Sequence, residues 1–176
     1  MNSIFTALSI SMLSAVPAVA QDMAPATPQP PPPKVHFAGP RTVVLDFKIT
    51  PDGKLYVPVK IGNRDLVLFI DTGATTIIDS YVAKELGIEM TESDDMGYGI
   101  TGVAGKRQIG TADLQFGTLK VTHFPVSFLD LEAVREHNRT HGMPPFDGLI
   151  GTDLLGLLRA DINYATRKLT LRRPAG

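Results

Sequence analysis

One acidic residue stands out by its position in the chain. Asp71 directly follows Leu66–Ile70, five apolar residues that predict a buried strand, and it is followed by Thr72 and Gly73. A carboxylate at the end of such a strand costs several kcal/mol unless partners or water receive it. A carboxylate in this position can take a proton from water, and a protonated carboxylic acid can give one to a carbonyl oxygen, so the Asp-Thr-Gly sequence is a candidate site of acid–base catalysis. The competing interpretation is a turn whose Asp caps a nearby amide.

Two other segments carry recognisable patterns. Phe146–Leu155 reads as a short apolar strand, a glycine and an Asp-capped helix. Met96–Gly105 is rich in glycine, and Gly97–Gly102 matches Gly-x-Gly-x-x-Gly, but polar residues precede it and no helix pattern follows, which argues against a dinucleotide-binding loop. Glycines permit positive φ and hinge motion, so this segment predicts the tip of a flap hairpin or a flexible loop without function.

The three segments together resemble the retropepsin-like aspartic proteases, in particular single-domain, exported members of bacterial type. The resemblance implies that Asp71 is catalytic, that Thr72 hydrogen-bonds across a dimer, and that Gly73 lets its backbone approach the carboxylate. Where the viral members commonly have Arg after the second glycine of the later motif, this chain has Thr152. This chain therefore lacks the Arg that forms one ion pair in those members, and the residues implied to carry the chemistry are unaffected.

The resemblance also implies how a substrate is held. Ala74 would border an extended polypeptide, and Gly99, Ile100 and Thr101 would cover it as a flap. The expected partners are a polypeptide substrate and a second copy of the chain, and neither a cofactor nor a metal is expected.

The expected function is that of an aspartic endopeptidase, a hydrolase with one Asp71 from each of two subunits. Two carboxylates about 4 Å apart repel by about 4 kcal/mol at an effective dielectric constant near 20, so the pair would hold one proton and contain acid and base together. One alternative is a catalytically inactive peptide-binding or scaffolding module on the same fold. Another is a structural protein of the cell envelope.

Other groups of acidic or histidine residues are weaker candidates for a functional site. Asp147 and Asp153 are acids within the segment Phe146–Leu155, but neither belongs to a second Asp-Thr/Ser-Gly, which disfavours an acid pair within one chain. His137 and His141 stand four positions apart without an obvious third ligand, which favours solvated loop histidines over a metal site.

The strand patterns predict a mostly β protein. Alternating residues in 43–49 and 55–61, with turn residues between them, indicate a hairpin. Further strands are expected from segments 111–116, 119–129 and 149–150. Segments 159–163 and 168–172 are expected to pair with each other across the turn between them. Helices are expected after Asp79 or Ser80, ending at Gly87, and also in segments 130–137 and 153–158. The predicted fold is a retropepsin-like closed β-barrel with one or two short helices and a flap hairpin.

Composition bounds the remaining possibilities. The chain has 176 residues, enough for one domain, and a net charge of −1 with scattered Lys and Arg, which predicts no nucleic-acid partner. Residues 1–20 resemble a signal peptide, 21–40 a proline-rich linker, and 41–176 the protease domain. The expected location is therefore periplasmic or secreted, without membrane contact unless the signal stays uncleaved as an anchor.

Overall fold

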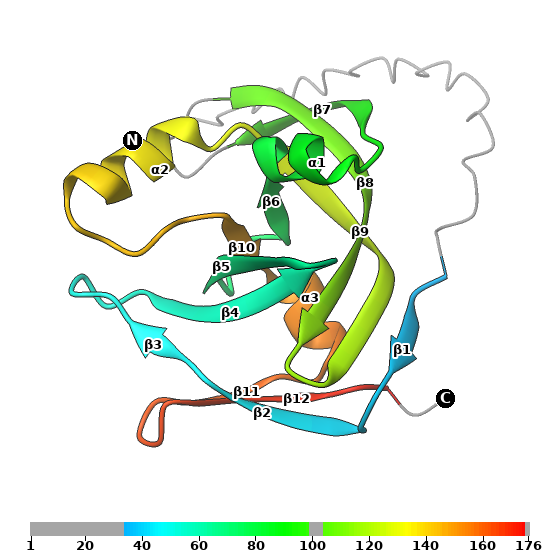
Figure 1. The fold of residues 1–176 in the computed structure, drawn as a ribbon, viewed down its shortest axis with the longest axis vertical. Coiled ribbons are helices and arrows are strands. Elements are labelled where there is room, and N and C mark those ends of the chain that lie inside the picture. Colours follow the sequence, from blue (N-terminus) through cyan, green and yellow to red (C-terminus); the bar gives the residue numbers. More distant parts are fainter. Residues whose placement is uncertain (1–33, 99–103, 175–176) are drawn as a thin grey trace, which may run out of the picture. The chain divides into compact units, whose positions relative to one another are not determined.

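The structure is a computed structural model that describes residues 34–98 and 104–174. Figure 1 shows how its strands and helices are arranged. The elements are, in chain order, β1 (His36–Ala38), β2 (Thr42–Asp46), β3 (Lys48–Ile49), β4 (Leu55–Ile61), β5 (Arg64–Ile70), β6 (Ile77–Asp79), α1 (Ser80–Leu86), β7 (Thr91–Tyr98), β8 (Ala104–Phe116), β9 (Leu119–Leu129), α2 (Glu132–Thr140), β10 (Gly148–Ile150), α3 (Thr152–Leu157), β11 (Asp161–Asn163) and β12 (Lys168–Arg172).

Six strands form a closed barrel in which each strand pairs with two neighbours. Their order is β9-β6-β10-β5-β4-β8, and pairing of β8 with β9 closes the ring. β10 runs parallel to β5 with Ile150 opposite Ile70, so it supports the strand that ends just before Asp71. The predicted mostly β, closed-barrel fold is confirmed, with three short helices in the described part of the chain.

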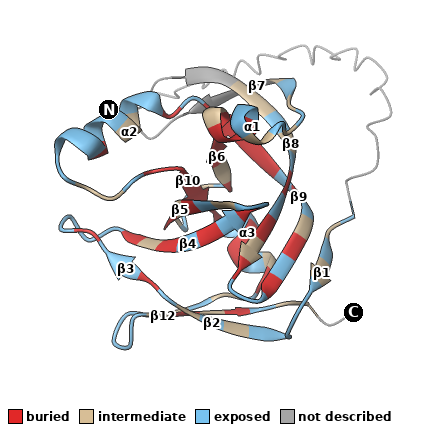
Figure 2. Cartoon of the chain, viewed as in Figure 1, coloured by how far each residue is buried: buried red, intermediate tan, exposed pale blue. Residues whose placement is uncertain are grey.

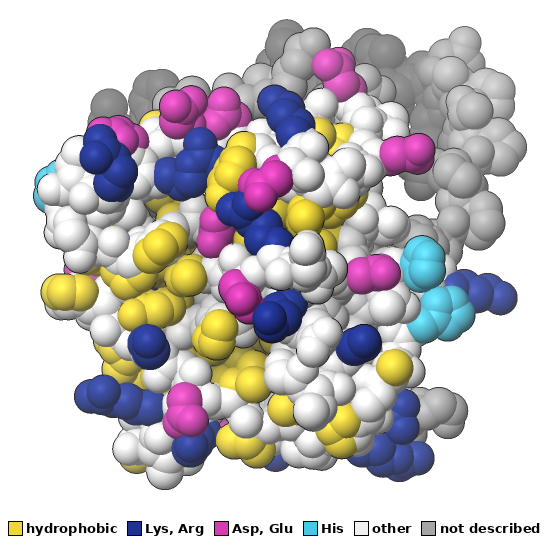
Figure 3. Space-filling model, viewed as in Figure 1, with side chains coloured by type: hydrophobic (Ala, Val, Ile, Leu, Met, Phe, Trp, Pro, Cys, Tyr) yellow, Lys and Arg dark blue, Asp and Glu magenta, His cyan; other side chains and the backbone are white. Residues whose placement is uncertain are grey.

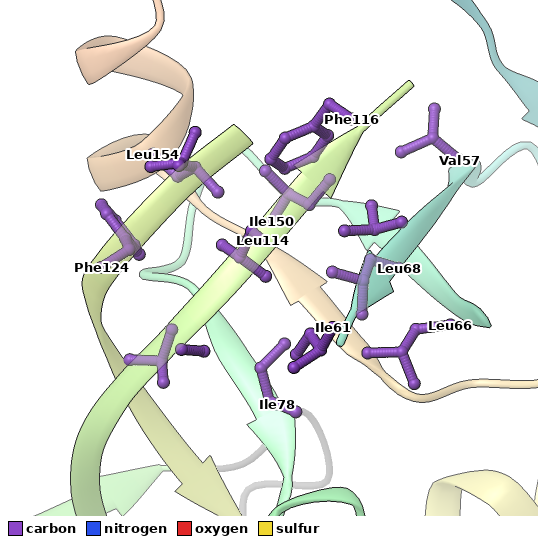
Figure 4. Packing of buried hydrophobic residues seen from close by; sticks show 14 of the residues in the cluster. Val57, Ile61, Leu66, Leu68, Ile78, Leu114, Phe116, Phe124, Ile150 and Leu154 are labelled. Atoms are coloured by element: carbon purple, nitrogen blue, oxygen red, sulfur yellow. The ribbon is translucent and has the colours of Figure 1, made fainter. Parts of the chain in front are cut away.

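Apolar side chains at alternate strand positions fill the barrel. In β4, Val57, Val59 and Ile61 are buried, whereas Pro58 and Lys60 between them are exposed. Figure 2 shows this alternation along the strands, and Figure 4 shows the packed cluster to which several strands and α3 contribute. Burial of each side chain of this size contributes about 1.5–3 kcal/mol, so the alternation fixes which face of each strand turns inward.

A second sheet has three strands in the order β11-β12-β2. The predicted pairing of segments 159–163 and 168–172 is confirmed by β11 and β12. The predicted hairpin of 43–49 with 55–61 is wrong in its first half, because β2 pairs with β12 and only the two residues of β3 pair with β4. Phe47 lies between β2 and β3 and is buried, and its N–H donates to the Arg167 carbonyl at 3.0 Å. The chain therefore passes from the second sheet to the barrel sheet at this residue.

Helix α1 begins and ends as its sequence predicts. The carboxylate of Asp79 accepts a hydrogen bond from the Tyr81 N–H at 3.1 Å, which caps the first turn. Gly87 has φ of 66° and ends the helix in the left-handed conformation that glycine adopts most easily. Both caps therefore lie at the residues that the sequence indicated.

β7 and β8 form the hairpin expected to carry the flap, with Tyr98 opposite Ala104 at its outer end. Its predicted tip, with Gly99, Ile100 and Thr101, lies outside the described residues, as do the predicted signal segment and most of the linker. Within residues 34–98 and 104–174, none of the helices combines the length and apolar character needed to span a bilayer.

Candidate active site

Asp71 is fixed to the barrel through its backbone. Its N–H donates to the Ile150 carbonyl at 3.0 Å, which extends the pairing of β5 with β10 by one residue. The Asp71 side chain is half-buried, and Thr72 and Gly73 are exposed. The acid is therefore held by a rigid strand pair and can still meet solvent or another molecule.

The turn after Asp71 orients the carboxylate. The Gly73 N–H donates to Oδ1 of Asp71 at 2.8 Å, and the Ala74 N–H lies 3.4 Å from the Asp71 carbonyl oxygen. A Cβ at position 73 would lie 3.3 Å from Oδ1, closer than such contacts usually are. The close backbone approach that the sequence led us to expect of Gly73 is therefore present.

The first residues of α3 hold this turn in place through hydrogen bonds. Thr152 donates to the Ala74 carbonyl through its N–H at 2.8 Å and through its hydroxyl at 3.1 Å. Oδ1 of Asp153 accepts from the N–H of Thr76 at 2.9 Å and from its hydroxyl at 2.7 Å. Thr152 thus holds the turn where the viral pattern has Arg, and the turn is connected to the barrel at both ends.

A cavity of about 320 Å³ opens beside the acid. Asp71 and Thr72 form part of its wall. The rest comes from β5 and β10, the turn before β4 and its first residue, the segment between β9 and β10, and the β11 hairpin. The remaining lining residues are Gly53, Lys54, Leu55, Phe69, Ile70, Val134, Asn138, Met143, Phe146, Leu149, Ile162 and Tyr164. Asp71 is the sole acidic group among these described lining residues.

The other two acids near the motif have different roles. Asp147 accepts from the Val67 N–H at 2.8 Å and from the Tyr81 hydroxyl at 3.2 Å, so its carboxylate holds β5 and α1 together. Asp153 braces Thr76, as described above. Neither lines the cavity that contains Asp71.

A partly buried ion pair connects α2 to the barrel. Asp79 has no exposed surface, and its second carboxylate oxygen accepts a hydrogen bond from the Arg135 guanidinium. The Arg135 guanidinium also lies 4.2 Å from the centre of the Tyr81 ring. Burial raises the pKa of Asp79 above its ordinary value, although the Tyr81 N–H and Arg135 both act to lower it.

This raised pKa predicts a pH-dependent difference between the wild type and Asp79→Asn. A carboxyl group whose pKa is raised by folding contributes stability that is full below its ordinary pKa, about 3.9, and is lost as pH rises through the raised value. We expect the free energy of unfolding of the wild type, relative to Asp79→Asn, to fall as pH increases. Urea unfolding of both proteins between about pH 3 and 7 measures this, and a difference that grows with pH contradicts it.

The residues predicted to form the site have different places in the structure. Asp71 and Thr72 line the cavity, whereas Gly73 lies on the exposed turn. Ala74 is half-buried and contacts the apolar cluster around Phe69, and its role beside a substrate stays a prediction. The flap residues are among those that the structure leaves undescribed.

The cavity also includes residues that the sequence did not assign to a site. Val134, Asn138 and Met143 belong to the segment between β9 and β10, and Ile162 and Tyr164 belong to the β11 hairpin. The amphipathic pattern of segment 130–137 predicts the helix that α2 forms, but it gives no sign of which surface that helix covers. These residues reach the cavity through packing between parts of the chain that are distant in sequence.

Solved structures that align with this chain include the following three. A retropepsin-like aspartic protease from Rickettsia conorii is 18% identical, with 81% of this chain and 97% of that chain covered and a TM-score of 0.48. The retroviral protease-like domain of Ddi1 from Leishmania major is 20% identical, with 67% and 87% covered and a TM-score of 0.46. EIAV protease in complex with the inhibitor HBY-793 is 16% identical, with 64% and 95% covered and a TM-score of 0.47.

The sequence comparisons give one match. No curated protein matches the chain. A family model described as "Aspartyl protease" matches residues 57–154, which is more than half of the chain. The match begins within β4, ends within α3, and contains Asp71 and its supporting turn. The chain therefore belongs to the aspartyl protease family.

Proposed function

We propose that this protein is an aspartic endopeptidase whose catalytic pair consists of Asp71 from each of two copies. The observation that carries the proposal is the position of Asp71: it is held at an exposed turn beside a cavity whose described lining contains no second carboxylate. Hydrolysis by activated water needs both an acid and a base. A second copy is the simplest source of the missing group.

The paired carboxyl groups supply a complete proton cycle. The ionised member takes a proton from water as the water oxygen bonds to the peptide carbonyl carbon, and the protonated member gives its proton to the carbonyl oxygen. The resulting tetrahedral diol collapses when the newly protonated member gives its proton to the amide nitrogen and the ionised member takes a proton from one of the diol hydroxyls. The C–N bond breaks, the amine leaves, and the pair again holds one proton. Aspartic proteases are the established case of two carboxyl groups that share one proton.

The second sheet offers a way to bring two copies together at Asp71. β11 is an edge strand of this sheet, and edge strands can pair with another chain. Ile162 of β11 and Tyr164 just beyond it line the same cavity as Asp71, and Tyr164 is 66% exposed. Pairing along this edge would cover an exposed aromatic ring next to the catalytic turn, which supports the proposed dimer.

The substrate in this proposal is an extended polypeptide covered by the β7–β8 hairpin. Extended peptides suit such clefts because backbone hydrogen bonds give affinity and alternate side chains enter pockets. The roles of Gly99, Ile100 and Thr101 as the flap, of Thr72 across the dimer, and of Ala74 beside the substrate are parts of the same proposal. We also propose export to the periplasm or the medium, from the pattern of residues 1–20.

Dimer formation predicts that specific activity depends on protein concentration. Below the dissociation constant of the dimer, the activity per milligram on a denatured protein should rise in proportion to concentration, because only paired subunits cut. Sedimentation velocity over the same dilution series should show the change from dimer to monomer. Full specific activity in a sample that sediments as a monomer contradicts the proposal, and peptide binding without cleavage at every concentration favours the inactive binding module.

A further inference from the structure

The segment between β9 and β10 forms a wall of the cavity beside Asp71. Residues 130–146 contain α2 and the chain that returns from it to the barrel. Val134 from α2, and Met143 and Phe146 from the returning chain, line the cavity together with Asp71. This insertion is therefore in a position to touch whatever binds next to the acid.

Three kinds of contact fix the insertion on the barrel. Leu131 and Phe146, near its two ends, are buried in a cluster with Phe69 of β5. The rings of Phe146 and Phe69 have centroids 5.0 Å apart. Arg135 is bound to the buried carboxylate of Asp79. A wall that is held at its ends and middle can define the size of a pocket.

Polar side chains that line the cavity already have partners within the protein. The side-chain amide of Asn138 donates to the Pro144 carbonyl at 3.0 Å, and the residue is 6% exposed. On the opposite side, the Lys54 ammonium lies 2.8 Å from the Asp52 carboxylate. Figure 3 shows hydrophobic side chains gathered on the face between α2 and the β3–β4 turn. The surface that remains for a ligand is mainly apolar.

The volume of the cavity, about 320 Å³, limits its occupant. Ligand pockets typically measure about 300–1,000 Å³, so this one suits a single large side chain rather than several residues of a peptide. We propose that Val134 and Met143 set the size of the substrate side chain admitted beside Asp71, and that this side chain is large and apolar. This inference rests on the proposed peptidase function.

Val134→Phe adds volume inside the cavity and tests the size limit. The assay is digestion of a reduced, denatured protein, with the cut bonds identified by mass spectrometry. Filling a pocket by a few methylene-sized groups changes discrimination by about 10–200-fold, so cleavage next to Phe, Trp and Leu should fall at least about tenfold relative to cleavage next to Ala. The matched control is Val44→Phe, the same change at a residue of β2 that is 54% exposed, and it should keep the wild-type preference.

Met143→Ala tests the opposite direction and does not depend on Val134→Phe folding. Removal of this half-buried side chain enlarges the cavity, so cleavage next to Trp should increase relative to Leu. Met90→Ala is the matched control, because Met90 is also half-buried and packs on the main core rather than on the cavity. If the wild type cuts and both Val134→Phe and Met143→Ala keep its preference, the inference is wrong and the peptidase function stands. Absence of cleavage by the wild type at any concentration overturns the proposed function instead.

A binding measurement tests the pocket without catalysis. The chain contains no tryptophan. The fluorescence of a blocked alanine peptide with one central Trp is therefore free of protein background when it is excited at wavelengths longer than those that tyrosine absorbs. The peptide is titrated with the Asp71→Asn protein, which should not cut it. The Trp emission should shift to shorter wavelength as the indole enters an apolar pocket. Val134→Phe in the same background should weaken binding at least about tenfold. Equal affinity with and without Val134→Phe overturns the inference whatever the outcome of the cleavage assays.

Discussion

Asp71→Asn is expected to abolish peptidase activity and leave the fold intact. An amide can neither take a proton from water nor deliver one to the carbonyl oxygen, and a homodimer of this variant lacks both members of the pair. Loss of a general acid or base typically lowers the rate by about 10²–10⁴-fold, and a change to both groups should give the upper end of that range. The asparagine oxygen can still accept the Gly73 N–H, so thermal unfolding should shift by only a few degrees.

Two controls make this result specific to the catalytic pair. Asp65→Asn is the same chemical change at a surface acid paired with Lys60 at 3.0 Å, and it should retain full activity. Asp71→Asn in excess should also inhibit wild-type protein, because mixed dimers hold one carboxyl group. Inactivation without inhibition in such mixtures contradicts a pair shared between copies, and unchanged cleavage by Asp71→Asn alone removes the assignment entirely.

Local patterns predicted much of the fold because they reflect local physics. Alternation of apolar residues identified β4, since burial on one face imposes a period of two, and short apolar runs identified β5 and β10. The three residues of β6, which is also a barrel strand, were not predicted. The start of α1 at Asp79 and its end at Gly87 follow from side-chain capping and from the freedom of glycine at positive φ. The same alternation hid the break at Phe47, because Val43, Leu45, Phe47 and Ile49 keep one period while the chain changes sheets.

The candidate site could be predicted only where its residues are neighbours in sequence. The turn from Asp71 to Gly73 is stabilised by a hydrogen bond between two of its own residues. Its conformation could therefore be inferred from the residue types that occur in it. Val134 and Tyr164 reach the same cavity through packing between distant elements, and no local pattern specifies that meeting. The pairing of Asp79 with Arg135 likewise could not be read from the helix cap that Asp79 forms.

Gly151→Ala is expected to cause a large loss of stability through a single added methyl group. A Cβ at position 151 would lie 2.2 Å from the carbonyl carbon of Thr75 and 2.4 Å from the carbonyl oxygen of Ala74. Both contacts are with backbone, which cannot rotate away as a side chain can. Relief would require the aspartate turn and the start of α3 to separate, and this would break the hydrogen bond from Thr152 to Ala74.

The expected cost of Gly151→Ala is at least about 3 kcal/mol, the upper end of the usual range for an overpacked core. A loss of that size lowers the unfolding temperature of a domain this large by about 10 °C, which calorimetry would measure. Gly156→Ala is the matched control: it lies in α3 with nothing within 4 Å of its Cβ position, so alanine should stabilise the helix by about 0.5–1 kcal/mol. Equal stability of the two variants would show that the turn and α3 are not in the close contact from which Asp71 takes its position. Any Gly151→Ala protein that still folds should lose activity beyond its loss of stability, because relief of the clash displaces the turn that orients the carboxylate.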